Sequence, residues 1–239
     1  MSKINRDSIE NALYVVATPI GNLGDVTYRA VEVLKGSHFV LAEDTRQTKK
    51  LFEKYGIDTP LVSYRDQNHD QIIPKIIEKL DAGLTLSLVS DSGTPNISDP
   101  GFKLVRELAQ QGYKIFAVPG PSAAIAALSI SGLPTDRFVF LGFLQKSESS
   151  RKELLKLYCE LRNTVVVYES PHRLKSLLEL LNSIYPRRVI AISFDLTKLY
   201  EECWRGTVEE AYKNFLNKQV KGEIVLAIAK EGFTLQKQP

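Results

Sequence analysis

Short apolar runs of strand length alternate along this chain with segments of helical periodicity, and this alternation constrains the fold more than any other feature. It is typical of βα units, in which helices join neighbouring parallel strands and cover the sheet. The runs are LYVVA from Leu13, HFVLA from His38, LTLSLV from Leu84, KIFAV from Lys114, FVFL from Phe138, TVVVY from Thr164, VIAISF from Val189 and EIVLAIA from Glu223. We therefore expect an α/β protein with a mainly parallel sheet.

Capping residues mark the starts of several predicted helices. A side-chain oxygen before the first turn can accept a backbone N–H, and proline is tolerated in that turn. Signals of this kind occur at Asp70, at Asp99 with Pro100, at Ser170 with Pro171, and at Thr207 with Glu210, which has capping-box spacing. The sequence thus predicts four helix starts between the apolar runs.

A stretch rich in glycine, proline, serine and alanine from Val118 to Arg137 indicates a connection between two lobes. We place the boundary near Thr135, so that residues 1–134 form an N-terminal α/β lobe and residues 135–239 a C-terminal one. A length of 239 residues is compatible with two small domains.

Composition excludes some classes of protein and leaves others open. Thirty-one basic and 28 acidic residues give a net charge of +3, which permits RNA binding without indicating it. No run approaches the roughly 20 apolar residues of a membrane helix, and the N-terminus lacks the apolar core of a signal peptide. We expect a cytoplasmic protein that does not bind a membrane. Cys159 and Cys203 lack paired-ligand spacing, so we expect neither a disulfide framework nor a metal site.

Turn residues mixed with charged and hydroxyl groups follow five of the predicted strands. Because ligands of open α/β sheets bind beyond the carboxyl ends of the strands, these segments predict one crevice built from several loops. The segments are TPIGNLGD from Thr18, EDTR from Glu43, SDSGTPNISDPG from Ser90, PGPSAA from Pro119 and ESPHR from Glu169.

The first and third loops give different signals. Gly21 and Gly24 invite comparison with the dinucleotide-binding fingerprint, but Pro19 occupies the place of its first glycine and has no N–H to donate, so nicotinamide binding is disfavoured. The third loop contains more glycine, proline, aspartate and hydroxyl-bearing residues than a simple turn requires. We expect Asp91 to accept hydrogen bonds from a ligand and Asp99 to act as an N-cap.

Several catalytic motifs do not occur in the sequence. It contains no GxxxxGK[ST] phosphate loop, no HExxH, no CxxC and no GxSxG elbow. Of the three histidines, His38 is expected to be structural, His69 lies in a polar segment, and only His172 follows a strand end in a position that suggests function.

Seven sequence blocks together resemble one family: LYVVATPIGNLGDVTYRAVEVL, AEDTRQTKKL, VSDSGTPNISDPG, VPGPSAAIAALSISGLPTDRFVFLGFL, YESPHRL, LTKLYEE and KGEIVLAI. In this order they are similar to the ribosomal small-subunit RNA methyltransferase I branch of the tetrapyrrole methylase superfamily. The likeness runs from about Leu13 to Ile228. It implies a two-lobed class III methyltransferase fold, with a mostly parallel sheet in the N-terminal lobe and a mixed sheet in the C-terminal lobe.

The resemblance also implies a function. Members bind S-adenosylmethionine in the cleft between lobes, act as homodimers and methylate the 2′-oxygen of a cytidine in the decoding region of 16S ribosomal RNA within the small ribosomal subunit. The cofactor-contacting positions carried over are Pro19, Ile20, Asp91, Thr94, Ser122, Ala123 and Tyr168. The polar positions expected on the acceptor side, as catalytic candidates, are Asp44, Arg46, Glu169, His172 and Arg173.

Alternatives remain open at this stage. Asp44, Glu169 or His172 could take the proton from the 2′-hydroxyl, and we favour Asp44 because Arg46 can orient it; EDTR is also explained by an N-cap with a surface ion pair. Where the family commonly has Ala-Arg-Glu, this chain has Ser193, Phe194 and Asp195. A tetrapyrrole or other small-molecule methyltransferase of the same fold, or a non-catalytic ribosome-binding relative, is the alternative function.

Overall fold

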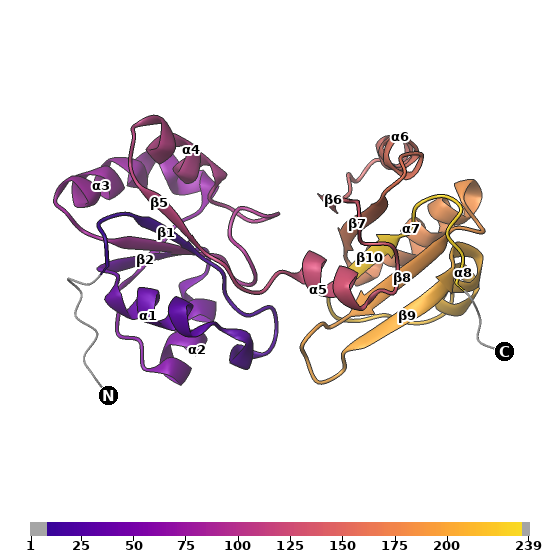
Figure 1. Ribbon diagram of the computed structural model, residues 1–239, viewed down its shortest axis with the longest axis horizontal. Helices are drawn as coiled ribbons and strands as arrows, with labels where there is room; N and C mark the ends of the chain where they lie inside the picture. The colour runs from indigo at the N-terminus through magenta and orange to yellow at the C-terminus, as the bar shows by residue number, and fades with distance from the viewer. Residues whose placement is uncertain (1–8, 236–239) are drawn as a thin grey trace. The chain divides into compact units, whose positions relative to one another are not determined.

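The structure is a computed structural model that describes residues 9–235. The chain divides into two compact units between Ser122 and Ala123, each built on one five-stranded sheet (Figure 1). The first residues, on which the expectation of no signal peptide partly rests, lie outside the described range. No helix within residues 9–235 has the length and apolarity needed to cross a bilayer.

The first unit carries a parallel sheet with helices on both faces. Its strands follow the order β3-β2-β4-β1-β5, and every pairing is parallel. The elements are β1 (Leu13–Val16), η2 (Leu23–Asp25), α1 (Tyr28–Gly36), β2 (Phe39–Ala42), α2 (Thr45–Tyr55), β3 (Leu61–Ser63), η3 (Asp66–Asn68), α3 (His69–Asp81), β4 (Leu86–Val89), α4 (Phe102–Gln110) and β5 (Ile115–Val118).

Alternation along the strands explains the two layers of helices in the first unit. Tyr14 and Val16 of β1 point into a core that includes residues of α1 and α2, whereas Leu13 joins residues of α3 and α4 on the other face. In Figure 1, α1 and α2 accordingly lie on one side of this sheet and α3 and α4 on the other. Because these strands are buried on both faces, their sequences are continuous apolar runs.

The second unit is built on a mixed sheet. Its strand order is β6-β7-β10-β8-β9; β6 runs parallel to β7, and the other pairings are antiparallel. The elements are α5 (Ala123–Ile130), β6 (Phe138–Phe143), α6 (Glu148–Cys159), β7 (Thr164–Glu169), α7 (Pro171–Ile184), β8 (Val189–Phe194), β9 (Glu202–Thr207), α8 (Val208–Phe215) and β10 (Ile224–Ile228). The mostly parallel and mixed sheets expected for the two lobes are therefore confirmed.

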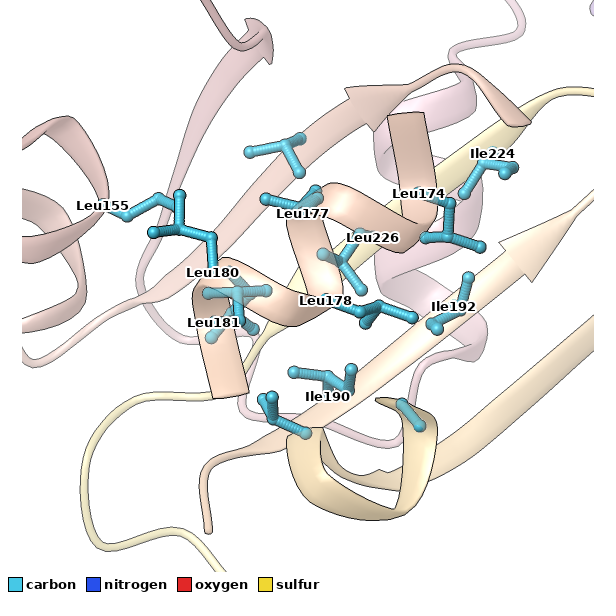
Figure 2. Packing of buried hydrophobic residues seen from close by; sticks show 14 of the residues in the cluster. Leu155, Leu174, Leu177, Leu178, Leu180, Leu181, Ile190, Ile192, Ile224 and Leu226 are labelled. Atoms are coloured by element: carbon cyan, nitrogen blue, oxygen red, sulfur yellow. The ribbon is translucent and has the colours of Figure 1, made fainter. Parts of the chain in front are cut away.

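The core of the second unit lies between α7 and the central strands. Figure 2 shows the leucines of α7 over Ile190 and Ile192 of β8 and over Ile224 and Leu226 of β10. Phe194 is also part of this core, with its ring centroid 5.5 Å from that of Phe215. The residue that stands where the family commonly has arginine is thus a packing residue in this chain.

The unit boundary in the structure differs from the one placed near Thr135. Helix α5 contacts β7 and β10, and the backbone N–H of Ala124 donates to the hydroxyl of Tyr168 at 3.2 Å. The helix therefore packs with the second unit although its small, apolar sequence suggested a connection.

Two of the helix starts predicted from capping residues agree with the structure, and one prediction of a cap does not. Thr207 and Glu210 form the predicted capping box, and Ser170 with Pro171 opens α7. The prediction that Asp99 caps a helix was wrong: α4 begins at Phe102, and its N-cap is Gly101, with φ +127°. Asp99 instead has a side-chain hydrogen bond with Ser90, so its carboxyl belongs to the loop after β4.

Candidate functional site

The loops that follow β1 and β4 are joined at the carboxyl edge of the first sheet. Thr18 and Gly93 form an antiparallel bridge, in which each backbone N–H donates to the other residue's carbonyl, at 2.9 and 3.0 Å. Gly93 has φ +76°, a conformation that favours glycine. The TPIGNLGD and SDSGTPNISDPG segments therefore form one continuous surface, as expected from their places after parallel strands.

The loop after β5 is fastened to the same edge. The hydroxyl of Thr94 donates to the carbonyl of Pro121 at 3.1 Å. Gly120 lies so close to Ala17 that a Cβ added there would be 3.0 Å from the Ala17 Cβ, so the chain approaches the end of β1 without a side chain between. This close approach explains the glycine at position 120, which is itself exposed.

The loops after β2 and β3 are also linked by hydrogen bonds to the carboxyl edge of the first sheet. The backbone N–H of Asp44 donates to Oδ1 of Asp91 at 2.9 Å, which links the EDTR segment to the loop after β4. Nε of Arg65 donates to the carbonyl of Glu43 at 3.1 Å, and the backbone N–H of Gly101 donates to Oδ1 of Asp66 at 3.3 Å. Five strand ends are thus connected by hydrogen bonds into one polar edge.

Asp44 and Arg46 form an exposed ion pair at the start of α2. Asp44 is the N-cap and accepts from the backbone N–H of Arg46, and both its oxygens also accept from the guanidinium, the shortest contact being 2.6 Å. The side chain of Arg46 is 85% exposed. The hydrogen bonds from Arg46 hold the pKa of the Asp44 carboxyl well below its usual range. The N-cap with a surface ion pair, considered from the sequence, is confirmed, and such a carboxylate is a weak proton acceptor.

Glu43 has the opposite electrostatic environment. Burial raises the pKa of its carboxyl, and the nearby charges of Asp91 and Asp99 raise it further, although a hydrogen bond from the Asp91 backbone opposes the shift. Burial likewise raises the pKa of Asp99. Sequence reasoning did not single out Glu43 for a chemical role, because the residue type reveals neither its burial nor its neighbours.

The cofactor-contacting residues expected in the first unit all lie at this edge. Pro19 and Ile20 are buried, Asp91 is exposed, and Thr94 and Ser122 are partly exposed. A Cβ at Gly93 would lie 3.4 Å from Cγ2 of Ile20, so the first and third loops pack directly against each other. The buried members shape the surface, and the exposed ones can contact a ligand.

Ala123 and Tyr168 belong to the second unit. Ala123 is the first residue of α5, and Tyr168 lies at the end of β7, with its hydroxyl near the start of that helix. The Tyr168 ring contacts the rings of Phe140 and Phe143, with centroids 4.8 and 5.5 Å away. The structure therefore surrounds Tyr168 with aromatic side chains that sequence reasoning did not select.

Glu169 and Arg173 form a second acid–arginine pair, at the junction of β7 and α7. The Glu169 side chain has no exposed surface; its Oε1 accepts from the backbone N–H of Ser170 at 2.9 Å and lies 3.3 Å from Nε of Arg173. Arg173 also donates through Nη2 to the carbonyls of Leu144 and Gln145, at 2.7 and 3.0 Å. Burial raises the pKa of the Glu169 carboxyl. This geometry suits a pair that positions the loop after β6 better than one that contacts a substrate.

His172 is exposed in the first turn of α7, one residue from Arg173. Across residues 9–235, no group of three or more histidine, cysteine, aspartate and glutamate side chains is arranged to hold a metal ion. The side chains at the described strand ends include carboxylates, guanidinium groups, hydroxyls, aromatic rings and the imidazole of His172.

Comparison with known protein families gives one match that covers most of the chain. The model of the tetrapyrrole (corrin/porphyrin) methylases matches residues 12–212. This range includes all five loops at the strand ends and every candidate site residue.

Relatives of known name are similar over nearly the whole length. The ribosomal RNA small subunit methyltransferase I of Halalkalibacterium halodurans is 45% identical over 93% of this chain and 77% of its own length. The protein of the same name from Bacillus subtilis is 43% identical over 94% of this chain and 77% of its own, and that of Thermotoga maritima is 42% identical over 91% and 97%.

Solved structures share the fold at low sequence identity. The methyltransferase CobJ has a TM-score of 0.71 at 17% identity and covers 95% of this chain and 97% of its own. The uroporphyrin-III C-methyltransferase of Thermus thermophilus has a TM-score of 0.62 at 19% identity, with 91% and 92% covered. These structures support the fold alone.

Proposed function

Since this chain belongs to the tetrapyrrole (corrin/porphyrin) methylase family and, within it, to the ribosomal RNA small subunit methyltransferases I, we propose that it methylates a ribose of 16S ribosomal RNA. The methyl donor is S-adenosylmethionine, and the acceptor is the 2′-oxygen of a cytidine in the decoding region. The observation that carries the proposal is identity above 40% to enzymes of this name over nine-tenths of the chain.

The carboxyl edge of the first sheet fits the cofactor chemically. Asp91 is exposed and can accept hydrogen bonds from a ribose hydroxyl or an ammonium group. Gly120 is exposed and carries no side chain, so a ligand can approach its backbone, and Ser122 adds a hydroxyl there. When bound, S-adenosylmethionine supplies an electrophilic methyl group. The chain's own contribution is to hold the donor and the acceptor oxygen in line, which can lower the barrier by several kcal/mol.

Asp44 and Arg46 fit the acceptor side. The exposed guanidinium of Arg46 can bind a phosphate of the RNA backbone, and Asp44 fixes its orientation through hydrogen bonds to Nε and Nη2. Because Asp44 is occupied in this way and its pKa is lowered, we assign it a positioning role.

Glu43 is the better proton acceptor at the same edge. It directly follows β2, and burial raises the pKa of its carboxyl, with a further increase from the charges of Asp91 and Asp99. A general base works best when its pKa is raised toward the operating pH. We therefore propose that Glu43 takes the proton of the 2′-hydroxyl as the new bond forms.

Transfer of a tritiated methyl group to small ribosomal subunits tests the proposed function. We expect label on RNA, in one nucleotide that resists alkaline hydrolysis because its 2′-oxygen is blocked, and faster transfer to assembled subunits than to naked RNA. A porphyrinogen serves as the matched alternative substrate. Label on a base, on protein or on the porphyrinogen would refute the assignment.

The cofactor site has a separate test. Asp91→Ala should weaken S-adenosylmethionine binding at least about tenfold, or about 1.4 kcal/mol, while the variant stays folded. Calorimetry of the purified protein measures the affinity. Unchanged affinity in a folded variant would remove Asp91 from the cofactor site.

We also propose a symmetric homodimer whose interface leaves the cofactor residues free. Two-fold pairing is the commonest assembly of soluble proteins, and two leucines are exposed here: Leu157 in the last turn of α6, 60% exposed, and Leu161 just beyond that helix, 47% exposed. Light scattering at micromolar concentration should give twice the mass of one chain. A monomer at that concentration would contradict the proposal.

A further inference from the structure

A bulge in β6 creates an aromatic surface at the end of the second sheet. Phe140 pairs with Val166 of β7, but the register then shifts so that Phe143 pairs with Tyr168. Regular pairing would place Gly142 beside Tyr168; instead Leu141 and Gly142 both fall between the two pairs, and Gly142 adopts φ +62°. The bulge therefore brings Phe143 to the same face as Phe140 and Tyr168, and we call these three residues the aromatic shelf.

The aromatic shelf is held rigidly. Its rings meet at steep angles, 66° between Phe140 and Tyr168 and 64° between Phe143 and Tyr168, which is a favourable edge arrangement. The Tyr168 hydroxyl accepts from the backbone N–H of Ala124. Nevertheless Phe143 remains 58% exposed. A large aromatic side chain is thus fixed in place with most of its surface available to a ligand.

The segment that follows Phe143 in the chain is held by one basic residue and carries another. The residues that follow Phe143, Leu144 and Gln145, are held by the guanidinium of Arg173, and the next residue, Lys146, is exposed. Arg173 itself is anchored by the buried carboxylate of Glu169. An exposed aromatic ring followed three residues later by an exposed lysine has the chemistry of a site for single-stranded RNA, in which a base stacks and a cation neutralises the backbone.

We propose that Phe143 of the aromatic shelf stacks on a nucleobase of the RNA acceptor strand. Sequence-tolerant stacking of an unpaired base is the usual way in which proteins hold RNA loops. This inference rests on the proposed function for the identity of the strand, whereas the stacking itself does not require methyl transfer. The adenine of the cofactor is the other base that could occupy the shelf, and the experiment separates the two.

Fluorescence of an RNA oligonucleotide tests the stacking directly. The probe is a short single-stranded RNA that carries pyrrolocytidine, whose emission falls when the base stacks. Binding to the full chain should quench it, and Phe143→Ala should weaken binding about tenfold. Phe143→Tyr should retain the quenching, whereas Phe143→Leu should lose it because a leucine side chain cannot stack. Phe138→Ala is the matched control, since Phe138 is 40% exposed at the opposite end of the same strand.

Two further measurements on the same variants complete the design. Phe143→Ala should raise the KM for small ribosomal subunits about tenfold, and its affinity for S-adenosylmethionine should stay within twofold of the original. Quenching that depends on Phe143 in a protein that methylates no RNA would leave the stacking standing and refute the proposed function. Three results would overturn the inference: no quenching by the original protein, equal quenching by Phe143→Ala, or a tenfold loss of cofactor affinity, which would place adenine on the shelf.

Discussion

The chain places an acid–arginine pair at the end of a strand in each unit, and the two pairs have opposite environments. Asp44 and Arg46 follow β2, and their side chains are 16% and 85% exposed. Glu169 is the last residue of β7 and Arg173 lies in the first turn of α7, and their side chains are 0% and 28% exposed. The two acid–arginine pairs therefore differ in environment: the guanidinium of Arg46 is open to solvent in one unit, and the carboxyl of Glu169 is fully buried in the other.

Burial determines what each pair contributes to stability. An exposed ion pair gains little because water and salt screen it, typically less than about 1 kcal/mol. A buried pair can be close to neutral overall, but removal of one partner leaves a charge without compensation and costs about 3–5 kcal/mol. The following predictions use this contrast.

The largest effect is expected from Glu169→Ala. It removes the acceptor of the Ser170 backbone N–H and of the Arg173 guanidinium and leaves the space of the fully buried side chain empty, so the free energy of unfolding should fall by about 3 kcal/mol or more. Denaturant titration at pH 7 measures the change. A loss below about 1 kcal/mol would mean that the pair behaves like the exposed one.

Glu169→Gln is the control for that experiment, and its pH dependence has a defined sign. The amide oxygen can still accept from Ser170 and Arg173, so the loss should be small. Because burial raises the pKa of Glu169 in the folded protein, the carboxyl's contribution to stability is fully present below its ordinary pKa of about 4.3 and declines as the pH rises through the folded value. From about pH 4 upward, Glu169→Gln should therefore gain stability relative to the original protein.

Glu43→Gln should give the next largest effect, on turnover rather than on folding. Loss of a general base lowers kcat by about 100-fold or more. In the original protein, kcat should fall with decreasing pH as Glu43 takes up a proton, and its raised pKa moves this decline above the usual range of a glutamate. Pre-steady-state methylation of small subunits between pH 4 and pH 9 measures both. An unchanged rate would mean that another residue acts as the general base.

Arg46→Ala should lower kcat/KM for ribosomal subunits by about tenfold, since one phosphate contact is lost. The free energy of unfolding should change by less than about 1 kcal/mol, and cofactor affinity should stay within a few fold. Lys54→Ala, in the last turn of the same helix, is the matched control. Full activity of Arg46→Ala would remove the exposed pair from the acceptor side.

The smallest effect concerns the cap of α2. Asp44→Ala removes the N-cap oxygen and should cost about 1 kcal/mol, whereas Asp44→Asn keeps an oxygen that can accept from the Arg46 backbone and should cost less. Since Arg46 lowers the pKa of Asp44, this contribution is present above the carboxyl's ordinary pKa and is lost only as the pH falls through the folded value. Thermal unfolding between pH 5 and pH 9 should show a constant difference between the original protein and each variant.

Much of the site could be predicted because strand ends are visible in the sequence. Asp91 and Thr94 lie at the edge where the run before them ends, since the carboxyl ends of parallel strands share one edge of the sheet. The raised pKa of Glu43 was not predictable, because it depends on burial and on the charges of Asp91 and Asp99, and Asp99 is 56 positions away in the chain. The position of Phe143 could not be predicted from the sequence either, because a one-residue bulge determines on which face of the sheet its side chain lies.

The sequence by itself determined the α/β pattern, because strands buried on both faces must be continuous apolar runs, and it determined helix starts where capping is local, as at Thr207. Strands β3 and β9 were not recognised. They are short or polar and exist because β2 and β8 offer hydrogen-bonding partners. Tertiary structure alone decided which acid–arginine pair is exposed: Asp44 turns back to cap a helix at the surface, whereas Glu169 remains in the last position of a central strand, where its neighbours exclude water.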